Sequence, residues 1–404
     1  MMKVLTIAAT SFFSDRGCHM RIYGDAKYLE KFGAEVKICT YFSGDDIAGL
    51  DIERIGKVGW YKRTAPGFSW GKFWLDIKLI FLCRRLIKEF RPDIIHGHMY
   101  EGFGVGYVAK RLTFQNPPVV VDLQADLEEE FKSYNRKNFI ARRFFVWLSR
   151  RLINRCNWLV VSSENVKPQM EQLYKHKDRI DIVRDGIDLE LFRNIPRLTQ
   201  DEQKKIAEIK EWAEGKKLLV YIGGLSDNKG VGELLEAFKN IKKLGFEEFR
   251  EFNSRKEKAE LWKKKDWKLL IGGFGNDEEK YKEYVGKNNL GDSVYFAGRV
   301  KYFSLPAYLA LADAAIDPKN GSTTEGSGKL VNLMAAGCPI VCFEKEFNRA
   351  RLGEKGHYMQ NFGDLDGILE GIQTSEKIHY DMEELGEEKE AKKLFEIFEK
   401  LTKK

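Results

Sequence analysis

The sequence lacks several features that would narrow its class at once. It has no apolar run of the ~18 residues that a membrane-spanning helix needs. Its six cysteines are scattered without a C-x-x-C pair, so reduced thiols in a cytosolic protein are expected. Its six histidines are dispersed as well. His96 and His98 can share one strand face, but no third ligand is evident near them, so no bound metal is expected.

Two familiar catalytic signatures are also missing. No full G-x-G-x-x-G opens the first strand–helix unit, and the glycines of IGGFGN at 271–276 come much later. The sequence therefore gives little support to a dinucleotide-dependent oxidoreductase. The paired carboxylates of a glycosidase are not evident as a unit either.

What the sequence does contain indicates a soluble globular protein with two domains. A chain of 404 residues is too long for one ordinary core, and 43% hydrophobic with 32% charged residues is typical of globular proteins. The net charge of +7 favours acidic partners, such as phosphorylated substrates or a membrane surface. The N-terminal MMKVLTIAAT is too short for a secretory signal and is expected to form a buried strand.

The first half of the chain alternates strands and helices. A strand at 3–9 leads into a polar turn containing Gly17, a helix at 18–32 and a strand at 35–40. This order predicts a parallel sheet that binds ligands at the C-terminal ends of its strands. The other elements expected here are strands at 93–97, 119–121, 158–162 and 180–183, with helices at Trp70–Phe90 and 139–156.

A turn at Asp185 and Gly186 and the polar stretch 194–215 separate this half from a second strand–helix series that starts at 218. Its expected strands are 218–224, 267–271, 293–296, 314–316 and Ile340–Phe343, and its expected helices are 231–244, 278–288 and 305–312. The charge-dense stretch 247–265 is expected to be a solvated helical insertion, not a nucleic-acid arm.

This pattern predicts three segments. They are an N-terminal domain at 1–193, a C-terminal domain at 194–380, and a closing segment at 381–404 with an amphipathic helix that can pack back on the first domain. The cleft between two such domains is the natural ligand site.

The stretch 321–343 combines a polar glycine-rich loop, a short helix and a buried strand. Such a loop aims several backbone N–H groups and the positive end of a helix at one point, which is an anion site. Gly326 and Gly328 would let the backbone come close to a phosphate, while Lys329 and Asn332 share one helix face. An ordinary loop–helix–strand connection would have the same pattern.

Five segments in order carry a family resemblance. RPDIIHGH at 91–98 resembles "pDvIHaH", IVRDGIDLELF at 182–192 resembles "ipnGvDlerF", and YIGGLSDNKGVGELLEAF at 221–238 resembles "yvGrl…KGvdlLleAf". The segment 294–318 resembles "V.F.G.v....l...y..aDv...P", and EGSGKLVNLMAAGCPIV resembles the donor-binding "EGfg…E.mA.G.PVV". The chain thus resembles retaining glycosyltransferases of family 4. Their α/β architecture, GT-B, has two Rossmann-like β/α/β domains facing a central cleft.

The resemblance implies a nucleotide-diphosphate sugar as donor, held mainly by the second domain. Lys229 would face the phosphates as a point charge, Glu325 would hydrogen-bond the sugar hydroxyls, and Asn332 would bind the ribose. The implied donor-binding residues are Gly223, Gly224, Lys229, Arg299, Val300, Glu325, Gly326, Ser327, Gly328, Lys329, Leu330 and Asn332. The implied catalytic residues are Glu325, Lys229 and His98.

The first domain would bind the acceptor. The implied acceptor-side residues are Gly17, Cys18, His98, Asp122 and Gln124, with Asp126 in the same loop as Gln124. The family often has a histidine in that loop, and this chain has none.

Two departures from the family pattern affect the donor site. Gly224 stands where the family commonly has an arginine, so the positive charge would come from Lys229, with Lys329 as a substitute. The family spaces two acidic residues eight positions apart, whereas here Asn332 replaces the second and Glu325 is displaced by one position. Asn still pairs with ribose hydroxyls, as donor and acceptor.

For the reaction, the resemblance implies transfer of a hexose-type sugar with retention, by front-face attack assisted by the leaving diphosphate. Catalysis would then be charge stabilisation and positioning, with no bound metal. The alternatives are a sugar-nucleotide epimerase of the same fold and a non-catalytic nucleotide-sugar or glycan-binding protein.

The segments 68–90 and 138–155 combine clustered Phe and Trp with Lys and Arg. Such helices can lie on an anionic membrane, which would fit a lipid-linked or cell-envelope glycan acceptor and a peripheral position at the cytoplasmic face. Core-packing helices with basic outer faces are the alternative.

Overall fold

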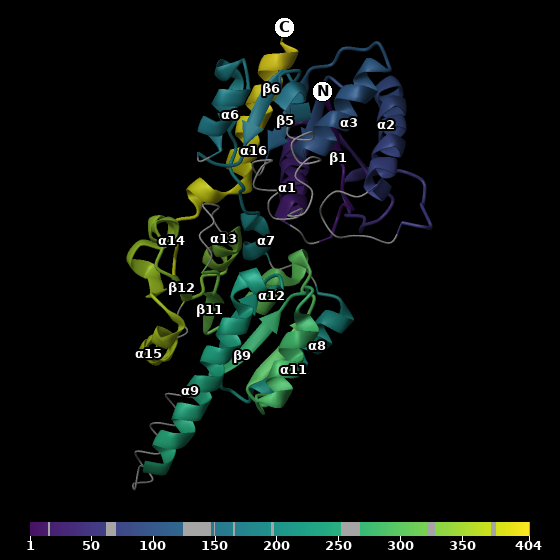
Figure 1. Cartoon of the computed structure of the whole chain (residues 1–404). Coiled ribbons are helices and arrows are strands. Elements are labelled where there is room, and N and C mark those ends of the chain that lie inside the picture. Colours follow the sequence, from purple (N-terminus) through teal and green to yellow (C-terminus); the bar gives the residue numbers. More distant parts are fainter. Residues whose placement is uncertain are drawn as a thin grey trace. The chain divides into compact units, whose positions relative to one another are not determined.

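The computed structural model describes residues 1–14, 17–61, 70–123, 147–148, 150–164, 166–194, 198–251, 267–320, 328–372 and 377–403. The chain divides into two compact units (Figure 1). Unit 1 contains Met1–Asp188 and is completed by Leu385–Lys404, while unit 2 contains Leu189–Glu384. Each unit has its own parallel sheet and its own apolar core.

Unit 1 is built on a seven-stranded sheet in the order β3-β2-β1-β4-β5-β6-β7, and every neighbouring pair is parallel. Its strands are β1 (Met2–Ala8), β2 (Ala34–Thr40), β3 (Asp51–Arg54), β4 (Ile94–His98), β5 (Val119–Leu123), β6 (Trp158–Val161) and β7 (Ile180–Ile182). The strand order reverses between β1 and β4. The loops that follow these two strands diverge there, which is where open parallel sheets bind ligands.

The two faces of this sheet are covered by different helices. Leu5 and Ile7 of β1 belong to the apolar cluster that includes the buried side of α2, whereas His96 of β4 has its ring beside Phe398 of α16. Since alternate residues of a strand point to opposite faces, α16 and its neighbour α1 cover the second face (Figure 1). The helices are α1 (Gly17–Lys31), α2 (Trp70–Phe90), α3 (Met99–Arg111), α6 (Lys167–Leu173) and α16 (Glu387–Thr402).

Unit 2 repeats this arrangement with a six-stranded parallel sheet in the order β10-β9-β8-β11-β12-β13. Its strands are β8 (Lys217–Ile222), β9 (Trp267–Gly272), β10 (Val294–Gly298), β11 (Ala314–Asp317), β12 (Ile340–Phe343) and β13 (Gly356–Met359). Its helices are α7 (Leu189–Arg193), α8 (Gln200–Ala213), α9 (Val231–Glu251), α11 (Glu278–Lys287), α12 (Leu305–Leu309), α13 (Gly328–Ala335), α14 (Glu346–Leu352) and α15 (Leu365–Gly371). Here the strand order reverses between β8 and β11.

The strands and helices expected from apolar patterns are confirmed within one to three residues where the structure describes them, and the expected Trp70–Phe90 and Ile340–Phe343 match α2 and β12. Helix α9 continues to Glu251, further than expected, and α12 ends earlier, at Leu309. Most of 139–156 and of 321–328 lies outside the described residues. Among the helices that the structure describes, none is long and apolar enough to cross a membrane.

Candidate functional site

In unit 2, three neighbouring strands end in glycines that hydrogen-bond to one another. Gly223, which follows β8, donates its N–H to Gly272 O of β9 at 2.9 Å, and Gly273 donates to Gly298 O of β10 at 2.8 Å. Along this part of the C-terminal edge of the sheet, the main chain therefore has no side chains of its own to cover it. Without side chains there, a ligand can approach main-chain groups closely.

Lys329 of α13 lies at the same edge. Its Nζ is 3.3 Å from Asp317 Oδ1, at the end of β11, and 4.0 Å from the ring centroid of Tyr221 on β8. Tyr221 in turn donates its hydroxyl to Gly224 O at 2.8 Å. Burial lowers the pKa of Lys329, while the Asp317 carboxylate opposes that shift. The result is a cation held next to the Gly223–Gly224 backbone.

The two glycines after β8 differ in the space around them. A methyl group built on Gly223 would come within 2.8 Å of both Lys329 Nζ and the Tyr221 hydroxyl. A methyl group on Gly224 would meet only Lys229 Cε, at 3.9 Å. Gly223 is therefore required by the close approach of Lys329, whereas Gly224 has room for a side chain.

Lys229 ends a short 3-10 helix, η2 (Asp227–Lys229), directly before α9. Its N–H donates to Ser226 O at 2.9 Å. Gly230, at φ 76°, packs so closely on β11 that a methyl group there would lie 2.0 Å from Pro318 O. The turn that carries Lys229 therefore packs against the residue that follows β11. The last residue of that strand, Asp317, is also the ion-pair partner of Lys329.

The other donor-side residues divide into three groups. Arg299 and Val300 follow β10, where a methyl group on Gly272 would touch Val300 Cγ2 at 2.8 Å, and Arg299 stacks over Phe274 at 5.4 Å. Gly328 begins α13, on which Leu330 is buried and Asn332 is half-buried. Glu325, Gly326 and Ser327 lie outside the described residues.

In unit 1, the loop that follows β1 is fixed from two sides. His19 Nδ1 accepts the N–H of Ser14 at 2.9 Å, and its Nε2 lies 2.9 Å from Thr10 Oγ1. Gly17 and Cys18 begin α1 just after this loop, and a methyl group on Gly17 would meet open space. His19 was not singled out from the sequence, although its place one residue after Cys18 puts it in the same turn.

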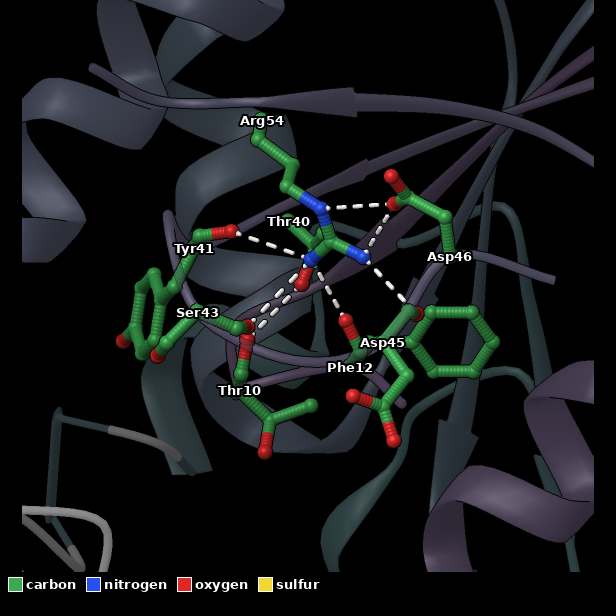
Figure 2. Close-up of polar contacts among 8 residues, drawn as sticks. All are labelled: Thr10, Phe12, Thr40, Tyr41, Ser43, Asp45, Asp46 and Arg54. Atoms are coloured by element: carbon green, nitrogen blue, oxygen red, sulfur yellow. Dashed lines mark hydrogen bonds and ion pairs between the residues drawn. The ribbon is translucent and has the colours of Figure 1, made fainter. Parts of the chain in front are cut away.

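Arg54 of β3 holds the other side of this loop (Figure 2). Its Nη1 donates to Phe12 O at 2.5 Å and Ser43 O at 3.2 Å, and its Nη2 donates to Asp45 O at 2.9 Å. The carboxylate of Asp46 pairs with the same guanidinium at 2.7 Å. One side chain therefore ties the loop after β1 to the loop after β2.

His98 and Asp122, expected on the acceptor side, are both buried under α1. They are register partners at the ends of β4 and β5, and His98 Nδ1 is 3.2 Å from Asp122 Oδ2. Arg21 of α1 donates its Nε to Asp122 Oδ2 at 2.6 Å and its Nη1 to Asp185 at 2.9 Å. The acceptor role of His98 and Asp122 stays a prediction, and Gln124 and Asp126 lie outside the described residues.

This buried group has strongly shifted protonation equilibria. Burial, opposed by the Arg21 charge, raises the pKa of Asp25 to about 7. Burial also opposes ionisation of Asp122, but Arg21 and His98 hold the pKa of that carboxyl below its usual range. Burial lowers the pKa of His96, with His98 adding to the effect.

Glu387, at the start of α16, belongs to the same group. Burial and the neighbouring Asp25 raise the pKa of Glu387 well above its usual value. No motif or pattern in the sequence singled out Arg21, Asp25 or Glu387. The i, i+4 spacing of Arg21 and Asp25 was the one available signal, and it does not reveal what faces them.

These two Rossmann-like units, each with a switch point at its central strands, define the GT-B class of fold, and comparisons with known proteins agree. A family model described as Glycosyltransferase Family 4 matches residues 17–191, and one described as Glycosyl transferases group 1 matches residues 202–392. The chain belongs to the GT-B glycosyltransferases. Among curated proteins, no sequence matches it significantly.

Solved structures share the fold at low sequence identity. Sucrose-phosphate synthase from Thermosynechococcus elongatus matches with a TM-score of 0.67 and 15% identity over 100% of this chain and 98% of that one. HepE from Anabaena in complex with UDP-glucose matches with 0.61 and 14% over 100% and 99%. A glycosyltransferase from Rickettsia africae matches with 0.62 and 15% over 100% and 99%.

Proposed function

We propose that this glycosyltransferase moves a hexose-type sugar from a nucleotide-diphosphate sugar, bound by unit 2, to a glycan, lipid-linked or cell-envelope acceptor, with retention of the anomeric configuration. The observation that carries the donor half is the pairing of a bare backbone edge with Lys329 at the β8–β11 switch point. A diphosphate requires such a combination of cations and main-chain donors.

The arrangement of the two lysines supports this choice of donor. Lys229 and Lys329 follow β8 and β11, which are neighbours in the sheet, and the helices α9 and α13 begin beside them. Both helices direct their positive ends toward the same edge of the sheet. HepE, which has the same fold, was solved with UDP-glucose.

The proposed chemistry relies on charge and positioning. As the glycosidic bond to the diphosphate breaks, negative charge accumulates on the phosphate oxygens, and Lys329 and Lys229 would stabilise it. Lys329 is already held, half-buried, beside Asp317, so it need not reorganise to meet this charge. Front-face attack by the acceptor hydroxyl would retain the anomeric configuration, and the leaving phosphate would take its proton.

A nucleotide titration tests the donor site. We expect UDP, GDP or ADP to raise the melting temperature of the wild type by mass action, and Lys329→Ala and Lys229→Ala to reduce that shift. Lys287→Ala, on the exposed end of α11, is the matched control and should behave like the wild type. No response to any of the three nucleotides would contradict the proposal.

Product analysis separates the alternatives. Transfer of labelled sugar to an acceptor, with the anomeric configuration of the donor, supports the proposal. Conversion of the donor sugar without an acceptor would identify an epimerase. Binding without any turnover would instead favour a non-catalytic binding protein, since Gly224 lacks the arginine that the family commonly has.

For the acceptor we propose a site near an anionic membrane at its cytoplasmic face. Helix α2 buries Leu75, Leu79 and Cys83 in the core, yet Trp74 is 48% exposed and Phe81 61% exposed. Exposed aromatics on a helix with several lysines and arginines favour an interfacial position.

Vesicle flotation tests the membrane proposal. The wild type should float with vesicles that contain phosphatidylglycerol and stay behind with neutral vesicles. Phe81→Ser together with Trp74→Ser should reduce flotation severalfold, whereas Phe114→Ser, an exposed aromatic outside α2, should not. Equal recovery of the wild type and the double variant would contradict the proposed role of α2.

A further inference from the structure

Four metal-ligating side chains converge between the sheet of unit 1 and α1. His96 and His98 point from β4, Asp122 from β5 and Asp25 from α1. One ligand atom from each lies within 4.8 Å of every other. The four residues are between 0% and 2% exposed, so they form an interior cluster and not a surface group.

Their polar atoms are largely without hydrogen bonds. Among the described residues, neither ring nitrogen of His96 has a hydrogen-bond partner, nor has His98 Nε2, while His98 Nδ1 lies 3.2 Å from Asp122 Oδ2 without a well-aligned hydrogen bond. The same holds for both carboxylate oxygens of Asp25 and for Asp122 Oδ1. Buried polar groups without partners cost stability, and so many in one place point to a ligand that satisfies them together.

The donor set selects a class of ligand. Imidazole nitrogen combined with carboxylate oxygen suits a divalent transition metal, whereas Mg²⁺ and Ca²⁺ prefer oxygen alone. A metal ion bound by four buried protein side chains has no open coordination position for a substrate. That arrangement is typical of structural metal sites. Tetrahedral Zn²⁺ with bonds of about 2.1 Å would bring the ligand atoms to about 3.4 Å from one another. The cluster would thus contract slightly on binding.

Arg21 is compatible with a cation at this position. Its guanidinium engages Asp122 through Oδ2 and Asp185 through Oδ1, which leaves Asp122 Oδ1 available, although Arg21 Nη2 also lacks a hydrogen-bond partner among the described residues. Four carboxylates, from Asp25, Asp122, Asp185 and Glu387, surround this single guanidinium. One further divalent cation would offset part of the negative charge that these groups carry when they are ionised.

We propose that His96, His98, Asp25 and Asp122 bind one divalent transition-metal ion of the Zn²⁺ type, which fastens α1 to the sheet of unit 1. The sequence predicted no metal because the two carboxylates are far from the histidines along the chain. The site lies in unit 1 and rests on side chains that the donor proposal does not use, although His98 and Asp122 are also among the residues implied for the acceptor side. The ion is structural, so the lysine-based chemistry of unit 2 does not depend on its reactivity.

Metal analysis of the full chain is the first test. Protein purified without chelator and dialysed should contain about one Zn²⁺ per chain by plasma mass spectrometry. Asp25→Asn and His96→Gln should reduce this to a small fraction, whereas His357→Gln, on β13 of unit 2, should retain it. Metal retained equally by all three variants would place it elsewhere and overturn the proposal.

A second measurement guards against variants that fail to fold. Wild-type protein stripped with a chelator should have a melting temperature several degrees lower, and adding Zn²⁺ should restore it. Adding Co²⁺ should instead produce the intense visible absorption of a tetrahedral nitrogen–oxygen site. A metal-free protein that shows neither a shift nor this absorption would overturn the proposal. Since nucleotide binding is measured separately in unit 2, its failure would leave this result intact.

Discussion

The sheets of the two units share one strand order around their switch points, yet they place charge differently. In unit 2, Asp317 at the edge is paired with Lys329, and the bare glycines leave the main chain accessible. In unit 1, the corresponding edge is backed by Asp25, Asp122 and Glu387 around Arg21.

The difference comes from what covers the sheet. Helix α16 returns to unit 1 from beyond unit 2 and packs against α1. Its buried positions Ala391, Leu394, Ile397 and Phe398 form one apolar stripe. One topology can therefore support a cationic edge in one unit and an enclosed acidic interior in the other, depending on the helices packed over it.

The largest expected effect comes from removing this cover. Phe398 is fully buried on α16 with its ring 5.3 Å from that of His96. Phe398→Ala should lower the free energy of unfolding of unit 1 by about 3–5 kcal/mol, because a large cavity opens over the sheet. Chemical denaturation measures it. Glu396→Ala, on the exposed side of α16, should change stability little, and equal effects would contradict the assigned packing.

Buried acids should make the stability of unit 1 depend on pH. Burial raises the pKa of Asp76 on α2 to about 7; Tyr41, which donates to it, and Lys72 oppose the shift, and Glu101 adds to it. The folded state therefore prefers the protonated acid. This contribution to stability is complete below about pH 4 and is lost as pH rises toward 7.

Asp76→Asn keeps a neutral acceptor for Tyr41 at every pH. Its gain over the wild type should grow between pH 4 and 7, reaching roughly 2–4 kcal/mol. Denaturant titrations at several pH values measure this gain. Asp292→Asn, exposed in unit 2, should show no such trend. A constant difference across this range would show that Asp76 ionises normally.

A smaller effect should distinguish the two glycines of the unit 2 edge. Gly223→Ala displaces Lys329 and should weaken nucleotide binding about tenfold, or about 1.4 kcal/mol. In Gly224→Ala the added methyl group makes only an ordinary van der Waals contact, so the nucleotide affinity of this variant should be within about twofold of that of the wild type. Calorimetry with the stabilising nucleotide measures both. If the two variants were equally impaired, Lys329 would not be the reason for the bare edge.

The smallest effect concerns the loops of unit 1. Arg54→Lys cannot reach all the carbonyls that the guanidinium binds and should lower the local opening free energy of residues 10–14 and 43–46 by about 1 kcal/mol. Amide hydrogen exchange measures this locally. Arg85→Lys, whose side chain is 53% exposed in its pair with Glu53, is the control and should leave the protection of both segments unchanged.

The sequence predicts those elements whose own residues carry the signal. Helix Trp70–Phe90 has a clear buried stripe, and Ile340–Phe343 is uniformly apolar, so both were found. Strand β3, with the sequence DIER, was missed because this short edge strand has charged residues at three of its four positions and no apolar alternation. Helix α8 was also missed, although Thr199 and Glu202 form a capping box at its start.

The cluster under α1 could not be predicted in the same way. Arg21 contacts Asp122 and Asp185, which lie 101 and 164 residues away. Such contacts depend on the sheet register, which pairs His98 with Asp122, and on the return of α16. The glycines and lysines of the unit 2 site could be predicted from the sequence, because they lie in or just after the loops that follow strands located by their apolar pattern.

The division of unit 1 into two chain segments has a consequence during synthesis. A ribosome completes Met1–Asp188 first, then all of unit 2, and only afterwards Leu385–Lys404. Domains generally fold as they emerge from the ribosome. Here the sheet of unit 1 is synthesised first, but one of its faces is covered only after α16 has been synthesised. Until then, the face of the sheet against which Phe398 packs, including His96, stays exposed to water and to chaperones. Unit 2 is thus the first part of the nascent chain able to finish folding.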